Sequence, residues 1–92
     1  MQQKQAEIRA ISVLGWLAGN DELLPVFLSA TGASETDLRI RAGESEFLGS
    51  VLDFLMMDDA WVIEYCDSHA LPYETLMQAR QSLPGGQDVS WT

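Results

Sequence analysis

A cysteine and a histidine lie three positions apart in the run Cys66-Asp67-Ser68-His69, and the chain has no second Cys or His. On adjacent helical turns, a thiolate and an imidazole can bind a metal ion or act as a nucleophile with its base. A zinc site needs about four such ligands. A cysteine nucleophile also needs a third residue and an oxyanion hole, and the sequence signals neither. We therefore expect Cys66 to be a small core residue. We expect His69 to lie at a helix C-terminus, where its cationic form suits the dipole.

Carboxylates gather at Asp53, Asp58 and Asp59, and two more stand at a matching turn, Asp21 and Glu22. Such a group can bind a divalent cation or act as an acid–base pair. The spacing does not fit a calcium-binding loop, and helix caps and first-turn acids explain Asp21, Asp58 and Asp59 better. We predict that the protein binds no metal and no cofactor and has no catalytic residue, and we expect that it is not an enzyme. The alternative is a small enzyme, or a metal- or ligand-binding protein, that uses Asp53, Asp58 and Asp59.

Three arginines and two aromatic residues are candidates for an interaction surface: Arg39, Arg41, Arg80, Trp61 and Tyr65. The arginines would form an anion site if the sixth helix lay beside the third. Otherwise they form ion pairs with nearby acids, and exposed pairs of this kind contribute about 0–1 kcal/mol. The helical spacing of the aromatic residues favours the core. At most one of them is expected to line a surface groove, because aromatic side chains with a polar atom are common in interfaces.

The composition limits the class of protein and of partner. A chain of 92 residues, 47% of them hydrophobic, is enough for one small domain. The net charge of −9, with five Lys and Arg against 14 Asp and Glu, disfavours nucleic acid and anionic membrane as partners. One cysteine cannot form an intrachain disulfide, which fits a reducing cytoplasm. The polar start predicts no secretory signal, and no apolar run is long enough to span a bilayer.

A ten-residue pattern occurs twice in the chain. Residues 12–21, SVLGWLAGND, return at residues 50–59 as SVLDFLMMDD. Each copy reads as an apolar helix end, a polar break and a new helix start, so Asn20 and Asp58 are predicted to cap the helices that follow. At the same offset, further residues correspond in pairs: Trp16 with Phe54, Leu24 with Val62, Phe27 with Tyr65, Gly32 with Ala70, and Leu38 with Leu76.

Hydrophobic periodicity predicts helices and no strand. The expected helices cover residues 1–18, 21–30, 35–41, 44–57, 58–70 and 71–83. We predict a compact all-α bundle of about six helices, built from two similar three-helix halves at about residues 8–43 and 44–84. The single domain would cover residues 1–86, with a C-terminal tail at 87–92.

Two of these helices have informative apolar faces. The first is expected to bury a face formed by Ile8, Ile11, Leu14, Leu17 and Ala18. Val13 and Trp16 widen this face, so the helix is expected to be covered on two sides. The fourth is apolar nearly all round, which is typical of a helix at the centre of a domain. A cap at Ser34 with Asp37 three residues later predicts the start of the third helix. Leu71-Pro72 is expected to begin the sixth, since proline suits the first helical turn.

Several motifs are shared with a known family. They are Trp16-Leu17-Ala18-x-Asn20-Asp21-Glu22-Leu23-Leu24, Phe47-Leu48-x-x-Val51-Leu52-Asp53-Phe54-Leu55 and Ala79-Arg80-x-x-Leu83-Pro84-Gly85-Gly86. With these motifs the chain resembles a small family of alphaproteobacterial proteins catalogued as domain of unknown function 3572. The resemblance spans nearly the whole chain and implies a cytoplasmic bacterial protein. It implies no activity and no catalytic residues.

The second half of the chain is the acidic half. After Gly43 the only Lys or Arg is Arg80. An acidic side can steer a basic partner toward the protein. Together with the missing catalytic motif and the aromatic residues, this favours a non-catalytic protein-interaction or adaptor module. Its partner would be a protein with a basic surface, or a second copy bound through an apolar groove, with no nucleic acid or membrane.

Overall fold

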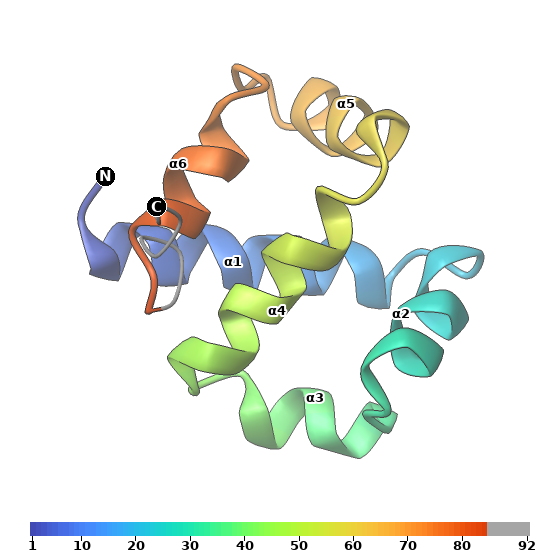
Figure 1. Ribbon diagram of the computed structural model, residues 1–92. Helices are drawn as coiled ribbons and strands as arrows, with labels where there is room; N and C mark the ends of the chain where they lie inside the picture. Colours follow the sequence, from blue (N-terminus) through green and yellow to red (C-terminus); the bar gives the residue numbers. More distant parts are fainter. Residues whose placement is uncertain (85–92) are drawn as a thin grey trace, which may run out of the picture.

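The computed structural model describes residues 1–84, which form six α-helices and no strand. The helices are α1 (Gln3–Ala18), α2 (Leu23–Thr31), α3 (Glu35–Arg41), α4 (Ser45–Leu55), α5 (Asp59–Ser68) and α6 (Thr75–Gln81) (Figure 1). The predicted all-α bundle is confirmed. The predicted domain end at residue 86 and the tail at 87–92 lie outside the described residues.

The fourth helix is central, as its composition predicts. α1 and α4 cross in the middle of the molecule, and α6 packs against both (Figure 1). α2 packs on α1, and α5 packs on α4. The buried residues of α4 take up most of its surface: Phe47, Leu48, Gly49, Val51, Leu52, Phe54 and Leu55. Fully burying one large apolar side chain contributes about 1.5–3 kcal/mol, so α4 supplies a large share of the hydrophobic stabilisation.

The two predicted corners are both present. Asn20 Oδ1 accepts hydrogen bonds from the backbone N–H of Glu22 at 3.0 Å and of Leu23 at 3.1 Å. Asp58 Oδ1 accepts one from the N–H of Ala60 at 2.9 Å. In both cases the side chain satisfies a backbone donor that has no partner within the new helix. The chain bends by 118° between α1 and α2, and it bends again between α4 and α5 (Figure 1).

The repeat continues to the ends of α2 and α5. Gly32 and Ala70, which correspond in the two halves, are the two residues within 1–84 with a left-handed backbone, at φ of 73° and 54°. After α5, the N–H of Leu71 donates to the carbonyl of Cys66 at 2.9 Å. This bond spans the left-handed residue and closes the helix in the manner of a Schellman motif.

The start of α6 differs from the prediction. The helix begins at Thr75 and not at Leu71. Leu71 is still engaged in the end of α5, and a separate turn follows in which the N–H of Thr75 donates to the carbonyl of Pro72 at 3.1 Å. Pro72 therefore precedes the helix, although proline is suited to its first turn. The predicted start of α3 is confirmed, because Ser34 and Asp37 form the reciprocal capping box.

The buried face of α1 agrees with the prediction at Val13, Leu14 and Leu17 but not at Ile8, Ile11 and Ala18. The structure buries Ala6, Ala10, Val13, Leu14 and Leu17. It leaves Ile8 61% exposed and Ile11 47% exposed, and Ala18 is exposed as well. Small alanines face the core because α6 and α4 pack on this side of α1 (Figure 1). The face that carries Ile8 and Ile11 is therefore turned outward.

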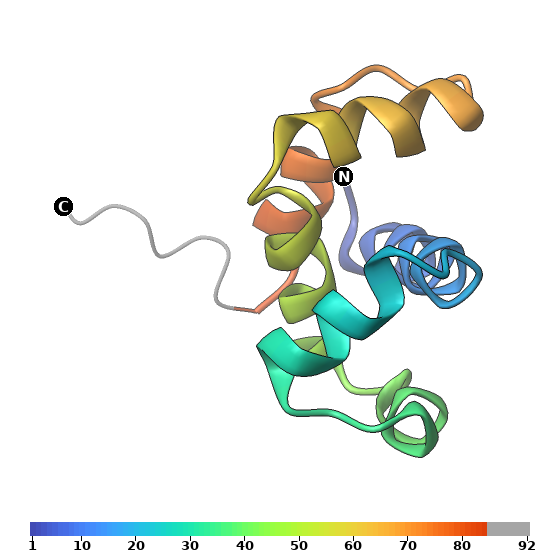
Figure 2. The ribbon, with the colours of Figure 1, turned by 90° about the vertical axis from the view of Figure 1, so that its right-hand side faces the viewer.

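The outer helices lie on opposite sides of the central pair. α5 lies above α1 and α4 in both views, and α3 lies below them (Figures 1 and 2). Within residues 1–84, no single helix is long and apolar enough to cross a membrane. α1 and α2 together would satisfy that test, but the chain bends by 118° between them.

Candidate functional site

Cys66 and His69 do not form a reactive pair. Cys66 is fully buried. Burial chiefly, followed by the negative charge of Asp67, raises the pKa of the thiol, which keeps it protonated. His69 is the C-cap of α5, and its ring stacks on Tyr65 with centroids 4.2 Å apart. Its Nδ1 lies 2.9 Å from the carbonyl of Tyr65. The predicted positions in the core and at a helix C-terminus are confirmed.

Tyr65 is fully buried, so it cannot meet a partner and does not belong among the interaction residues. Its hydroxyl lies 2.7 Å from Ser12 Oγ, and Arg9 Nη1 donates to it at 3.2 Å. Both partners lie on α1, so the phenol links α5 to α1. Trp61 is half-buried and stacks on Phe54 with centroids 5.0 Å apart, which leaves only part of its indole at the surface.

The three arginines do not converge on an anion site. α6 packs on α1 and α4, away from α3. Arg80 Nε donates to Asp53 Oδ1 at 2.7 Å, and Arg41 Nε lies 3.3 Å from Glu44 Oε1. The Arg41 guanidinium also lies over the Phe47 ring, 4.6 Å from its centroid. Arg39 forms no ion pair within residues 1–84 and lines an apolar groove.

The acidic residues are also dispersed. Asp53 is occupied by Arg80, Asp58 caps α5, and Asp59 lies in the first turn of that helix. In the part of the chain that the structure describes, no three His, Cys, Asp or Glu side chains are grouped so as to hold a metal ion. The arrangement therefore gives no support to the alternative of an acidic catalytic or metal site.

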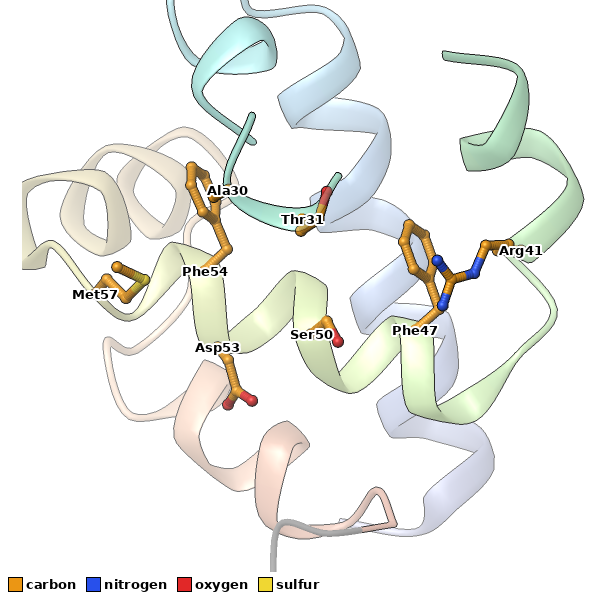
Figure 3. Close-up of a pocket in the computed structure, with 8 residues that line it drawn as sticks. All are labelled: Ala30, Thr31, Arg41, Phe47, Ser50, Asp53, Phe54 and Met57. Atoms are coloured by element: carbon orange, nitrogen blue, oxygen red, sulfur yellow. The ribbon is translucent and has the colours of Figure 1, made fainter. Parts of the chain in front are cut away.

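A depression of about 330 Å³ lies over α4. Its lining comes from the end of α2, from α3, from α4 and from the turn after α4: Ala30, Thr31, Arg41, Phe47, Ser50, Asp53, Phe54 and Met57 (Figure 3). Its two charged side chains, Arg41 and Asp53, lie at different ends (Figure 3), and each is already paired with another residue. Catalysis requires polar groups that converge on one point, and this depression does not provide them.

An apolar groove with a volume of about 240 Å³ lies between α1 and α3. Its lining residues are Ile11, Leu14, Gly15, Ala18, Leu38, Arg39 and Ala42. Arg39 is the only charged residue among them. The apolar surface extends along α1 to Ile8, one turn before Ile11. We call Ile8 together with these lining residues the α1–α3 face.

Sequence reasoning missed the α1–α3 face because it assigned Ile8 and Ile11 to the core. A second apolar stripe is present in the sequence, formed by Ala6, Ala10, Val13 and Leu17. A helix with two such stripes can bury one and leave the other for a partner. Gly15, on the outer stripe, was a further signal, since a helix interior disfavours glycine unless something else requires it.

The comparisons with known proteins give one result. Residues 3–86 match the family described as "Protein of unknown function (DUF3572)". No curated protein and no solved structure matches the chain. The match covers all six helices, including both sides of the α1–α3 face.

Proposed function

Since the chain belongs to the DUF3572 family, we propose a function from its surface: a non-catalytic interaction module that binds a protein helix on the α1–α3 face. The observation that supports this is the exposure of Ile8 and Ile11, at 61% and 47%. Both continue into a groove that is apolar except for Arg39. Contiguous apolar surface of this kind marks interaction sites in folded proteins.

The energetics favour a partner that covers this face. Fully burying one exposed isoleucine side chain contributes about 1.5–3 kcal/mol, and about half of the surface of Ile8 and of Ile11 is still open to a partner. Two isoleucines and a groove beside them therefore provide a substantial driving force for association, after its entropic cost is met. A groove between two helices suits an amphipathic helix, whose apolar side chains recur at every third or fourth position.

The charge distribution indicates a protein partner. Four of the five basic residues lie on α1 and α3: Lys4, Arg9, Arg39 and Arg41. The net charge is nevertheless −9, which opposes binding to a nucleic acid backbone. We also propose a cytoplasmic location, supported by the single cysteine, which is buried as a free thiol.

The test is a comparison of two aspartate substitutions in capture from a native lysate. Ile8→Asp places a charge in the α1–α3 face. Ile63→Asp places the same charge on α5, which lies on the opposite side of α1 and α4 from α3 (Figure 1). The native Ile63 side chain is 43% exposed. Both variants should keep the melting temperature of the parent within a few degrees. A protein recovered in stoichiometric amount with the parent and with Ile63→Asp, but lost with Ile8→Asp, is the expected result. Equal recovery with all three chains would overturn the proposal, and so would recovery of no stoichiometric protein if the chain is also a monomer in solution.

A further inference from the structure

We propose that the occupant of the α1–α3 face is a second copy of this chain, packed with its α1 antiparallel to the first. This proposal rests on the proposed function, because it names the partner for the same face. It is carried by the order of side chains along the outer stripe of α1: Lys4, Ile8, Ile11, Gly15 and Ala18. Large side chains stand in the first half of this stripe and small ones in the second.

Each copy therefore presents a projection and a recess. Ile8 is the projection, being the most exposed large hydrophobic side chain of α1, at 61%. Gly15 is the recess, because no atom lies within 4 Å of the position that a Cβ would occupy there. It also lines the groove. The two residues are two helical turns apart on one face, about 10.5 Å along the axis.

An antiparallel pair fits these two features together twice. With a two-fold axis near Ile11, Ile8 of each copy faces Gly15 of the other, and Ile11 meets its own counterpart. A two-fold interface requires such reciprocity, since each residue must contact the counterpart of the residue that contacts it. Close approach of the two helices is possible because Gly15 and Ala18 add little bulk.

The charges select the antiparallel direction. A parallel pair would bring Lys4 against Lys4 of the partner. The antiparallel pair brings Lys4 to the C-terminal end of the partner's α1, where the helix dipole favours a cation. Asp21 follows directly after that end and adds an opposite charge. Within each copy, no acidic residue lines the groove.

Sedimentation of the full 92-residue chain, from low micromolar to millimolar concentration, tests whether it dimerises. The parent and the control Ile63→Asp should form a concentration-dependent dimer, and Ile8→Asp should remain a monomer. Gly15→Leu is the more specific variant. A Cβ at this exposed position meets open space in the monomer, so the fold should melt no lower, yet the recess is filled and the dimer should be lost.

Mixed crosslinking tests the direction of packing. Ile8→Cys and Gly15→Cys chains, oxidised together, should give a disulfide-linked heterodimer, while each chain alone should give little. A pair of Ile63→Cys chains serves as the negative control. The native Cys66 is buried and does not compete. Strong crosslinking of Ile8→Cys with itself would overturn the antiparallel arrangement.

A parent chain that stays monomeric throughout would overturn the proposal of a second copy. The lysate capture described above would then decide separately on the proposed function. If a different protein is captured and lost with Ile8→Asp, only the dimer is refuted. If nothing is captured and the chain is monomeric, both proposals fail.

Discussion

Trp16 meets Tyr65 edge to face, with ring centroids 5.7 Å apart and ring planes at 85°. The corresponding residues of the repeat, Phe54 and Phe27, meet in the same way at 5.1 Å and 75°. The first pair joins α1 to α5, and the second joins α4 to α2. Each half therefore places the ring from its first helix against the second helix of the other half. The predicted equivalence of these residues is confirmed.

The Tyr65 hydroxyl gives the first prediction. Tyr65→Phe removes the bonds to Ser12 and Arg9 and should lower the free energy of unfolding by about 1 kcal/mol. A double-mutant cycle with Ser12→Ala should give a coupling of about 0.5–1.5 kcal/mol. Tyr73→Phe, which removes an exposed bond to Asp67, is the control and should change stability by less than about 0.5 kcal/mol. Urea denaturation measures the stability of the two single variants, the double variant and the control. A coupling near zero would contradict the proposed link between α5 and α1.

The two corner caps give the second prediction. Asn20→Ala and Asp58→Ala should each cost about 1 kcal/mol, because a helix N-terminus loses its side-chain acceptor. Asn20 accepts two backbone N–H groups and Asp58 accepts one, so Asn20→Ala should cost at least as much. Asp59→Ala, one residue beyond the cap, is the matched control. Equal losses for Asp58→Ala and Asp59→Ala in thermal unfolding would mean that charge, and not capping, stabilises this corner.

The left-handed residues give the third prediction. Ala70 has a φ of 54°, a region in which a Cβ is strained, whereas Gly32 is unstrained at 73°. Ala70→Gly should therefore stabilise the protein by about 0.5–1 kcal/mol, and Gly32→Ala should destabilise it by about 1 kcal/mol or more. Denaturant midpoints report both changes. If the two substitutions shifted stability in the same direction, the shared backbone conformation would not be the cause.

Two helical glycines give the fourth prediction. Gly15→Ala meets open space and should add about 0.5–1 kcal/mol through helix propensity. A Cβ at Gly49 would lie 3.0 Å from Arg80 Nη1, so Gly49→Ala must displace the guanidinium that pairs with Asp53. The gain in stability from Gly49→Ala should therefore be smaller than that from Gly15→Ala, or absent. In an Arg80→Ala background the full gain should return, as measured by urea denaturation in dilute solution. An unchanged effect in that background would show that Arg80 is not the obstacle.

Glu7 gives a prediction of pH dependence. Ser45 Oγ donates to its carboxylate at 2.6 Å and Gln3 Nε2 donates at 3.2 Å. These bonds lower the pKa of Glu7 by favouring its charged form. A lowered folded-state pKa contributes stability above the ordinary pKa, and this contribution is lost as the pH falls through the folded value. The difference in melting temperature between the parent and Glu7→Gln should therefore shrink with acidification. The control is Glu64→Gln, whose native carboxylate forms no hydrogen bond within residues 1–84. If the difference in melting temperature between the parent and Glu7→Gln stayed constant with pH, the hydrogen bond from Ser45 to Glu7 would have no part in the stability.

Local signals made much of the fold predictable. The caps at Asn20, Asp58 and Ser34 act within three residues of themselves, so the sequence alone contains them. The central position of α4 was also predictable, because a helix that is apolar on nearly every side has no polar face that could be exposed to solvent.

The features that depend on distant partners were not predictable. Ile8 and Ile11 look like core residues until α4 and α6 pack on the opposite side of α1 and bury Ala6 and Ala10. Tyr65 looks like a surface candidate because its hydroxyl needs a partner. Its partner is Ser12, 53 positions earlier in the chain, and no local pattern reveals that distance.

The exchange of aromatic rings between the halves has a consequence for how the chain can be divided. A cut after Gly43 would leave each fragment with its own corner but without the ring that covers it. Residues 1–43 would expose Trp16 and Phe27, and residues 44–92 would expose Phe54 and Tyr65. Neither fragment is autonomous, but the two are complementary. Mixed in solution, the two fragments should associate and fold together, because each supplies the aromatic ring that the other lacks.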